Sequence, residues 1–155
     1  MVFDEIKEDK MKAKDLFGIT GIVEVYKNYE KDHRTHNLVV DGGKEWVASM
    51  MKAGDTIMTH MAVGTDATTE DGAQQVLIGE VARIDFATYG TVVVSGNTIV
   101  YTATFGAGVG TASLNEAGIF NAASLGTMLA RTKFGGPITK GVDDVVTIVW
   151  TITIS

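Results

Sequence analysis

From residue 17 onward, apolar and polar residues alternate along much of the chain. In residues 19–29, Ile19, Val23 and Val25 are separated by polar or aromatic neighbours. Residues 145–155 show the alternation most clearly, because every second side chain is large and apolar. Successive side chains of a strand point to opposite faces, so this period of two predicts half-buried β-strands. In the last strand, one face carries Val146, Ile148, Trp150, Ile152 and Ile154, and the other is rich in threonine.

The same criterion predicts further strands, joined by polar or glycine-rich turns. We expect residues 36–40 to be the antiparallel partner of 19–29, across a polar turn that contains Asn28 and residues 30–32. Ser95-Gly96-Asn97 can supply positive φ and predicts a tight hairpin between 91–94 and 98–105. The remaining predicted strands are 57–63, 80–89 with a bulge, 112–121, and 127–134, which ends at a Gly135-Gly136-Pro137 turn.

The period changes after residue 40. Trp46, Val47, Met50 and Met51 recur at the spacing that places four large apolar groups on one face of a helix. We expect Asp41 to cap the start of this helix and Gly54 to end it. Residues 64–72 read as a polar loop, and 73–78 as one further helical turn. We assign four large residues to the core: Trp46, Met50, Met51 and Trp150. An interface role for them is the lesser alternative.

Together these elements predict an all-β protein: an antiparallel β-sandwich or jelly-roll-like barrel with one short helix. The composition agrees, because 18 glycines and one proline suit many tight turns. A chain of 155 residues is long enough for one domain with its own core. It contains no cysteine, which excludes disulfides, thiolate metal sites and a cysteine nucleophile.

Charge divides the chain into two parts. Residues 1–34 carry 15 charged side chains, whereas residues 35–155 carry 17. We therefore expect a charged N-terminal arm at residues 1–16 and a β-sandwich domain at residues 17–155. The arm has no apolar stretch typical of a secretory signal, and no window resembles a membrane span, so we expect a soluble protein made in a cytoplasm. The net charge of −6 argues against binding to nucleic acid.

Candidate chemistry is sparse. His33 and His36 lie three residues apart, a spacing that points to opposite faces of a strand and suits chelation poorly. His60 fits a structural strand histidine better than a general base. Residues 42–44 lack the full spacing of a phosphate-binding loop, and residues 106–110 lack that of a dinucleotide fingerprint.

The acidic groups give no stronger signal. Residues 66–72 lack the ligand pattern of an EF-hand, although a weak surface Ca²⁺ or Mg²⁺ remains an alternative there. Asp143 and Asp144 fit a turn better than a paired-carboxylate site. We therefore predict no catalytic, cofactor-binding or metal-ligating residues, no cofactor and no enzymatic activity.

Several blocks occur in the same order in a known class of proteins. They are His36-Asn37-Leu38-Val39-Val40-Asp41-Gly42-Gly43, M-A-V-G-T at 61–65, L-I-G-E-V-A-R at 77–83, N-E-A-G-I-F-N-A at 115–122, I-T-K at 138–140 and T-I-V-W-T-I-T-I-S at 147–155. In these blocks the chain resembles small tailed-bacteriophage virion proteins of the head-decoration (cement) or tail-fibre-like type. The resemblance covers residues 17–155.

The resemblance implies a non-enzymatic structural protein of the virion, assembled in the host cytoplasm. Its expected partners are the major capsid protein and other copies of itself; trimers at local three-fold positions are usual for decoration proteins. Neither nucleic acid nor a membrane is expected as a partner. The charged arm would reach a neighbouring subunit and become ordered on binding. The alternatives are a tail, collar or fibre-associated protein, or a receptor- or glycan-binding sandwich in which Tyr26, Tyr29 or Tyr89 stacks on sugar rings.

Overall fold

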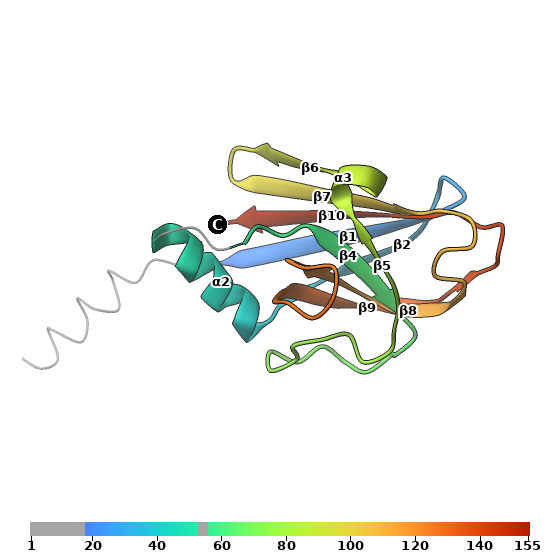
Figure 1. Ribbon diagram of the computed structural model, residues 1–155, viewed down its shortest axis with the longest axis horizontal. Coiled ribbons are helices and arrows are strands. Elements are labelled where there is room, and N and C mark those ends of the chain that lie inside the picture. The colour runs from blue at the N-terminus through green and yellow to red at the C-terminus, as the bar shows by residue number, and fades with distance from the viewer. Residues whose placement is uncertain (1–17, 53–55) are drawn as a thin grey trace, which may run out of the picture.

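The protein is a sandwich of two antiparallel sheets, each with five strands, in a computed structural model that describes residues 18–52 and 56–155 (Figure 1). The first sheet has the order β2-β1-β10-β7-β6 and the second the order β3-β9-β8-β4-β5. The strands are β1 (Ile19–Lys27), β2 (Glu30–His36), β3 (Leu38–Val39), β4 (His60–Gly64), β5 (Glu80–Asp85), β6 (Gly90–Ser95), β7 (Thr98–Phe105), β8 (Ala112–Phe120), β9 (Met128–Lys140) and β10 (Val146–Ile154); the helices are α2 (Asp41–Lys52) and α3 (Phe86–Tyr89).

The predicted sandwich is confirmed, and the barrel alternative is not, because the sheets remain open. The structure describes a second helix, α3, in addition to the predicted helix α2. None of the helices in the described ranges is long and apolar enough to cross a membrane. The predicted arm at residues 1–16 lies outside the described residues, as does Gly54.

The alternation in β10 places Trp150 at the centre of the core. Val146, Ile148, Trp150 and Ile152 are all buried between the sheets, as their spacing predicted. The indole Nε1 of Trp150 donates a hydrogen bond to Asn37 Oδ1 at 3.0 Å, which satisfies the one polar atom of the buried ring. β10 lies between β1 and β7 in continuous antiparallel register, so its burial holds the middle of the first sheet.

One predicted strand pairing is wrong. The hairpin partner of β1 is the charged strand β2, which follows a tighter turn at Asn28 and Tyr29, both with positive φ. Residues 36–40 instead supply β3, which pairs with β9 in the other sheet. The charges of residues 30–32 suggested a turn, but an edge strand also tolerates them because one side faces water.

The predicted Gly135-Gly136-Pro137 turn is also wrong, because β9 runs through it. Leu114 of β8 pairs with Ile138 of β9, and Glu116 pairs with Lys133. Four residues of β9, 134–137, therefore lie opposite one residue of β8 and form a bulge. Proline is tolerated at such a position because no ladder hydrogen bond is required from it.

Three other boundaries differ from the predictions. Residues 57–59 precede β4 instead of belonging to it, and residues 73–78 form an irregular loop rather than a helical turn. The predicted strand 80–89 ends at Asp85, whose side chain accepts a hydrogen bond from Thr88 N and caps α3.

At the start of α2, the Val40 carbonyl oxygen accepts a hydrogen bond from Lys44 N, and the Asp41 carboxylate contacts Lys44 Nζ at 3.3 Å.

A buried ion pair anchors the long loop 65–79 to the outer face of the second sheet. Glu116 and Arg131 are both fully buried, and Arg131 Nε donates to Glu116 Oε2 at 2.9 Å. The same carboxylate accepts hydrogen bonds from the backbone N–H groups of Ile78 and Gly79, while Arg131 NH1 donates to Thr68 O. Both ends of the loop are thus bound by one pair of charges.

The anchored loop covers a second, smaller apolar cluster. Its Leu77 packs with Val40, Ala62, Phe120 and Met128. Gly64, where the loop begins, must be glycine, because a Cβ there would lie 2.4 Å from Glu116 Oε1. The loop therefore acts as a third layer over the sandwich.

Replacing Trp150 with Ala should lower the free energy of unfolding by about 3–5 kcal/mol, since it removes a large buried side chain and leaves a cavity. Urea denaturation followed by circular dichroism measures this. Val142→Ala, at a side chain that is 62% exposed, is the control and should change stability by less than about 0.5 kcal/mol. A near-neutral result for Trp150→Ala would contradict the assigned face of β10.

Replacing Glu116 with Gln should cost about 3–5 kcal/mol, because it leaves the Arg131 guanidinium buried without a counter-charge. Hydrogen exchange at the amides of Ile78 and Gly79 should become faster in the same variant. Glu24→Gln, in the exposed Glu24–Lys31 ion pair, is the matched control and should cost less than about 1 kcal/mol. Equal losses in the two variants would mean that the buried pair does not anchor the loop.

Candidate functional site

An apolar groove lies at one end of the sandwich, between α2 and the first sheet. It has a volume of about 270 Å³, and its lining is almost entirely apolar. The walls come from α2, from the ends of β1 and β10, and from the β6–β7 hairpin. The principal lining residues are Ile19, Trp46, Val47, Met50, Val94, Ile99, Tyr101, Leu129, Ile152 and Ile154.

The first and last described residues meet at this end of the molecule. Gly18 and Ser155 exchange two backbone hydrogen bonds, Gly18 N to Ser155 O at 2.8 Å and Ser155 N to Gly18 O at 2.9 Å. Figure 1 shows α2 lying beside the start of β1 and the C-terminus. Residues 1–17 therefore join the body next to Ile19, which lines the groove.

The helix face that borders the groove is only partly buried. Trp46 and Val47 pack against the core but remain half-buried, and Met50 is also half-buried. The Trp46 indole donates to Thr56 O at 2.8 Å, which fixes the ring at the groove wall. The prediction that these residues belong to the core is thus correct in part, because the same face also forms an accessible apolar surface. The Met51 side chain lies outside the described part.

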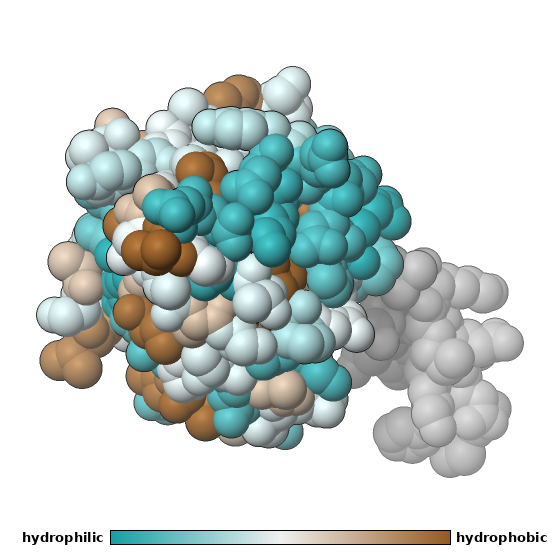
Figure 2. Space-filling view, turned by 90° about the vertical axis from the view of Figure 1, so that its right-hand side faces the viewer, coloured by the Kyte–Doolittle hydropathy of each residue, from teal (hydrophilic) through white to brown (hydrophobic). Residues whose placement is uncertain are grey.

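The opposite end of the sandwich has a different character. It is formed by the β1–β2 turn and the loops that follow β7 and β9. Figure 2 looks onto this end and shows hydrophilic side chains gathered on one side of it, with hydrophobic ones scattered over the rest.

Asp144 links two of the turns at this end. Its carboxylate accepts hydrogen bonds from Asn28 Nδ2 and Gly141 N and lies 3.5 Å from Lys27 Nζ. These contacts lower the Asp144 pKa, chiefly through the Asn28 hydrogen bond. This confirms that Asp144 belongs to a turn.

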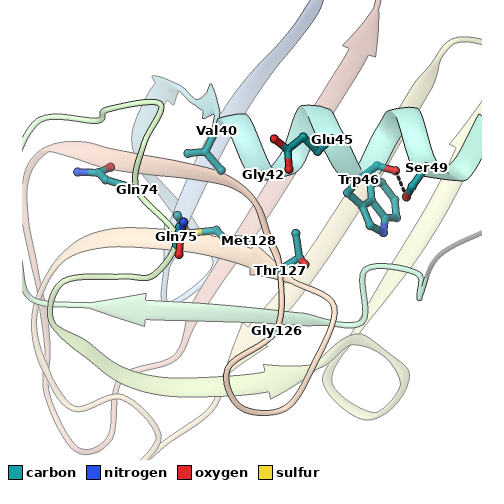
Figure 3. A pocket seen from close by; sticks show the side chains of 10 residues that line it. All are labelled: Val40, Gly42, Glu45, Trp46, Ser49, Gln74, Gln75, Gly126, Thr127 and Met128. Carbon is teal, nitrogen blue, oxygen red and sulfur yellow. Dashed lines mark hydrogen bonds between the residues drawn. The ribbon is translucent and has the colours of Figure 1, made fainter.

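A pocket of about 380 Å³, lined by polar and apolar groups alike, lies between the first turns of α2 and two loops (Figure 3). Gln74 and Gln75 enter it from the loop 65–79, and Gly126 and Thr127 from the loop before β9. The Gln74 amide is already bound within the fold: Oε1 accepts from Asp71 N, and Nε2 donates to Thr69 O. This part of the pocket wall therefore serves mainly to hold the loop in place.

A wider cleft of about 920 Å³ opens between β5 and the β6–β7 hairpin. His60 and Asp85 lie at its base, and Tyr89 borders it with 52% of its surface exposed. Burial lowers the His60 pKa, against a weaker opposite effect of Asp85. His60 Nδ1 lies 2.7 Å from Thr59 Oγ1, so this ring is held by its own neighbour.

The other residues that the sequence singled out are dispersed. His33 is half-buried against Phe134, with ring centroids 6.4 Å apart, whereas His36 is exposed. In the acidic loop, Asp66 Oδ1 accepts from Thr68 N, and Glu70 accepts from Lys133 N. Within residues 18–52 and 56–155, no group of three or more His, Asp or Glu side chains could hold a metal ion.

The three tyrosines considered for sugar stacking have different surroundings. Tyr26 is half-buried on β1, and Tyr29 is exposed at the β1–β2 turn. Tyr89 lines the wide cleft. The apolar groove was not anticipated, although the apolar face of α2 was its visible signal in the sequence.

No family model, curated protein or solved structure matches the chain.

Tyr101 at the groove provides a test of how far water enters. Burial raises the pKa of its phenol to about 12, and its ring lies 5.2 Å from that of Phe86. Because ionisation is disfavoured in the folded state, stability should fall as the pH rises from about 10 to about 12. Phenolate absorbance, taken as the difference between wild type and Tyr101→Phe, should show a transition near pH 12. A transition near pH 10 would show that solvent reaches this ring.

Proposed function

We propose that this protein is a non-enzymatic structural protein of a tailed-phage virion that decorates the head and stabilises the capsid shell. Its partners would be the major capsid protein and other copies of itself. The resemblance of residues 17–155 to decoration and tail-fibre-like proteins supports a place in the virion. Head and tail proteins share these blocks, and the position of the protein in the intact virion distinguishes the two.

The observation that carries the proposal is the apolar groove. Burying apolar surface is the main favourable contribution to association between proteins, and a contiguous exposed apolar patch marks an interaction surface. Here the groove lies beside exposed Val94 and Ile154, at the end where residues 1–17 join the body. A protein whose task is to bind a shell needs such a surface.

The polar part of the opposite end suits the outward side of a bound subunit. Its charged turns are held by internal contacts such as those of Asp144, and they would remain solvated when the groove is covered (Figure 2). In this arrangement, Gly18 lies on the side of the shell, and a segment with both signs of charge, such as residues 1–16, can pair with a neighbouring subunit.

The proposal predicts that Ile154→Glu abolishes binding to capsids, because it places a charge in the apolar contact. Purified protein would be added to heads that lack it, and occupancy would be measured by co-sedimentation and cryo-electron microscopy. Val142→Glu is the matched control, since Val142 is an exposed apolar side chain at the opposite end. It should bind as the wild type does.

Position and copy number in the intact virion test the assignment to the head. We expect many copies on the shell, and deletion of the gene should lower the tolerance of heads to heat or low salt. Protein found only on the tail would overturn the proposal, as would equal binding by Ile154→Glu and Val142→Glu.

We propose glycan binding, as in a tail, collar or fibre-associated protein, as the second candidate function. The specific observation that favours it is Tyr89, an exposed aromatic ring beside Thr88, Thr91 and Thr102 at the wide cleft. Aromatic faces with nearby hydroxyls suit sugar rings. A glycan array would then show binding by wild type that Tyr89→Ala removes, whereas no binding by wild type would exclude this alternative.

A further inference from the structure

Among the residues that the structure describes, nothing pairs with the outer edge of strand β6 in the first sheet. There β6 pairs with β7 alone, and α3 lies beside its start (Figure 1). Every residue from Thr91 to Ser95 is exposed, including Val92 (43%), Val93 (55%) and Val94 (68%). This is an apolar strand with little burial on either face.

The hairpin geometry shows which backbone groups are free. Ser95 pairs with Thr98 across the two-residue loop Gly96-Asn97, and Gly96 has a φ of +59°. The pair that closes such a loop exchanges both hydrogen bonds, and the pairs then alternate along the hairpin. The N–H and C=O groups of Val92 and Val94 therefore point away from β7 toward the open side.

The other edge strands of the described part are protected against pairing. β2, at the far edge of the same sheet, carries Glu30, Lys31, Asp32 and Arg34. In the second sheet, β5 carries Glu80, Arg83 and Asp85, and β3 has two residues. Charge and shortness are the usual means by which proteins prevent edge-to-edge association.

By contrast, β6 has no charge, no proline and no bulge in its register with β7. The whole hairpin from Gly90 to Phe105 is free of charged residues, in a chain with a net charge of −6. Two copies repel each other through most of their surface, and this hairpin is a region where they can approach without opposing like charges.

The sequence of β6 is also matched to itself. Thr91-Val92-Val93-Val94-Ser95 has the same chemical order in both directions: a hydroxyl, three valines and a hydroxyl. In an antiparallel pair centred on Val93, Val92 of one copy lies opposite Val94 of the other, so the free N–H and C=O groups meet as hydrogen-bonded pairs. Thr91 then lies opposite Ser95, where the hydroxyls can bond.

We propose that two copies of this protein pair through β6 across a two-fold axis at Val93, joining their first sheets into one continuous ten-stranded sheet. An isologous contact of this kind is closed, so it yields a dimer rather than a filament. Val94 also lines the apolar groove, and the pairing would place Val92 of the second copy beside it on the same face of the joined sheet. The inference does not rest on a place in the virion.

The test uses the purified full-length protein, and its first readout is mass in solution. Light scattering should give twice the chain mass of 16.5 kDa. Val92→Pro removes an outward N–H, which an edge strand tolerates. It should shift the mass to that of a monomer with an unchanged circular dichroism spectrum, and the urea midpoint should no longer depend on protein concentration.

A cysteine provides the second readout, because the chain has none of its own. Opposed residues of a non-hydrogen-bonded antiparallel pair have Cα atoms about 4.5 Å apart, within the range that a disulfide spans. Val93→Cys should therefore oxidise almost completely to a covalent dimer. Val142→Cys, at an exposed valine of the opposite end, should not. A monomeric or trimeric wild type, a dimeric Val92→Pro, or equal cross-linking of the two cysteine variants would overturn the proposal.

Discussion

The buried pair of Glu116 and Arg131 is the interaction on which the second sheet and its covering loop depend. Two charges out of water are tolerated only when each is neutralised and hydrogen-bonded. The fold meets this requirement by bringing Thr68, Ile78 and Gly79 to the pair, so the loop 65–79 completes the charged site that anchors it. Leu77 is thereby held over Phe120, whose ring also lies under the Arg83 guanidinium at 3.7 Å. A loop without regular structure is thus tied to the second sheet near both of its ends.

The sequence predicted the strands whose two faces differ in chemistry. β10 and β7 alternate between apolar and polar residues, and the Gly96-Asn97 turn marks the β6–β7 hairpin, so local rules were sufficient for these strands. The pairing of β3 with β9 joins segments that are far apart in the sequence, which no local pattern contains. The β1–β2 hairpin is local, but the charges of β2 also fit a turn. The β9 bulge has the residues of a turn, because Gly135, Gly136 and Pro137 satisfy the requirements of either structure.

The candidate surface was predictable only in part. Trp46 and Met50 showed that α2 has an apolar face, but whether that face is covered depends on how far the sheets extend beneath it. The three valines of β6 read as an ordinary strand, and their exposure follows from the position of β6 at the sheet edge. The buried Glu116 and Arg131 gave no signal at all, since isolated charges in a strand usually face water.

The meeting of the first and last strands has a mechanical consequence. β1 and β10 are antiparallel neighbours, and Gly18 and Ser155 lie side by side at one end. A force applied between the two ends of the body would load the hydrogen bonds of this pair one after another, as in opening a zipper, instead of shearing them all together. The body would therefore resist mechanical unfolding best if the load entered through its faces and edges and not at its chain ends.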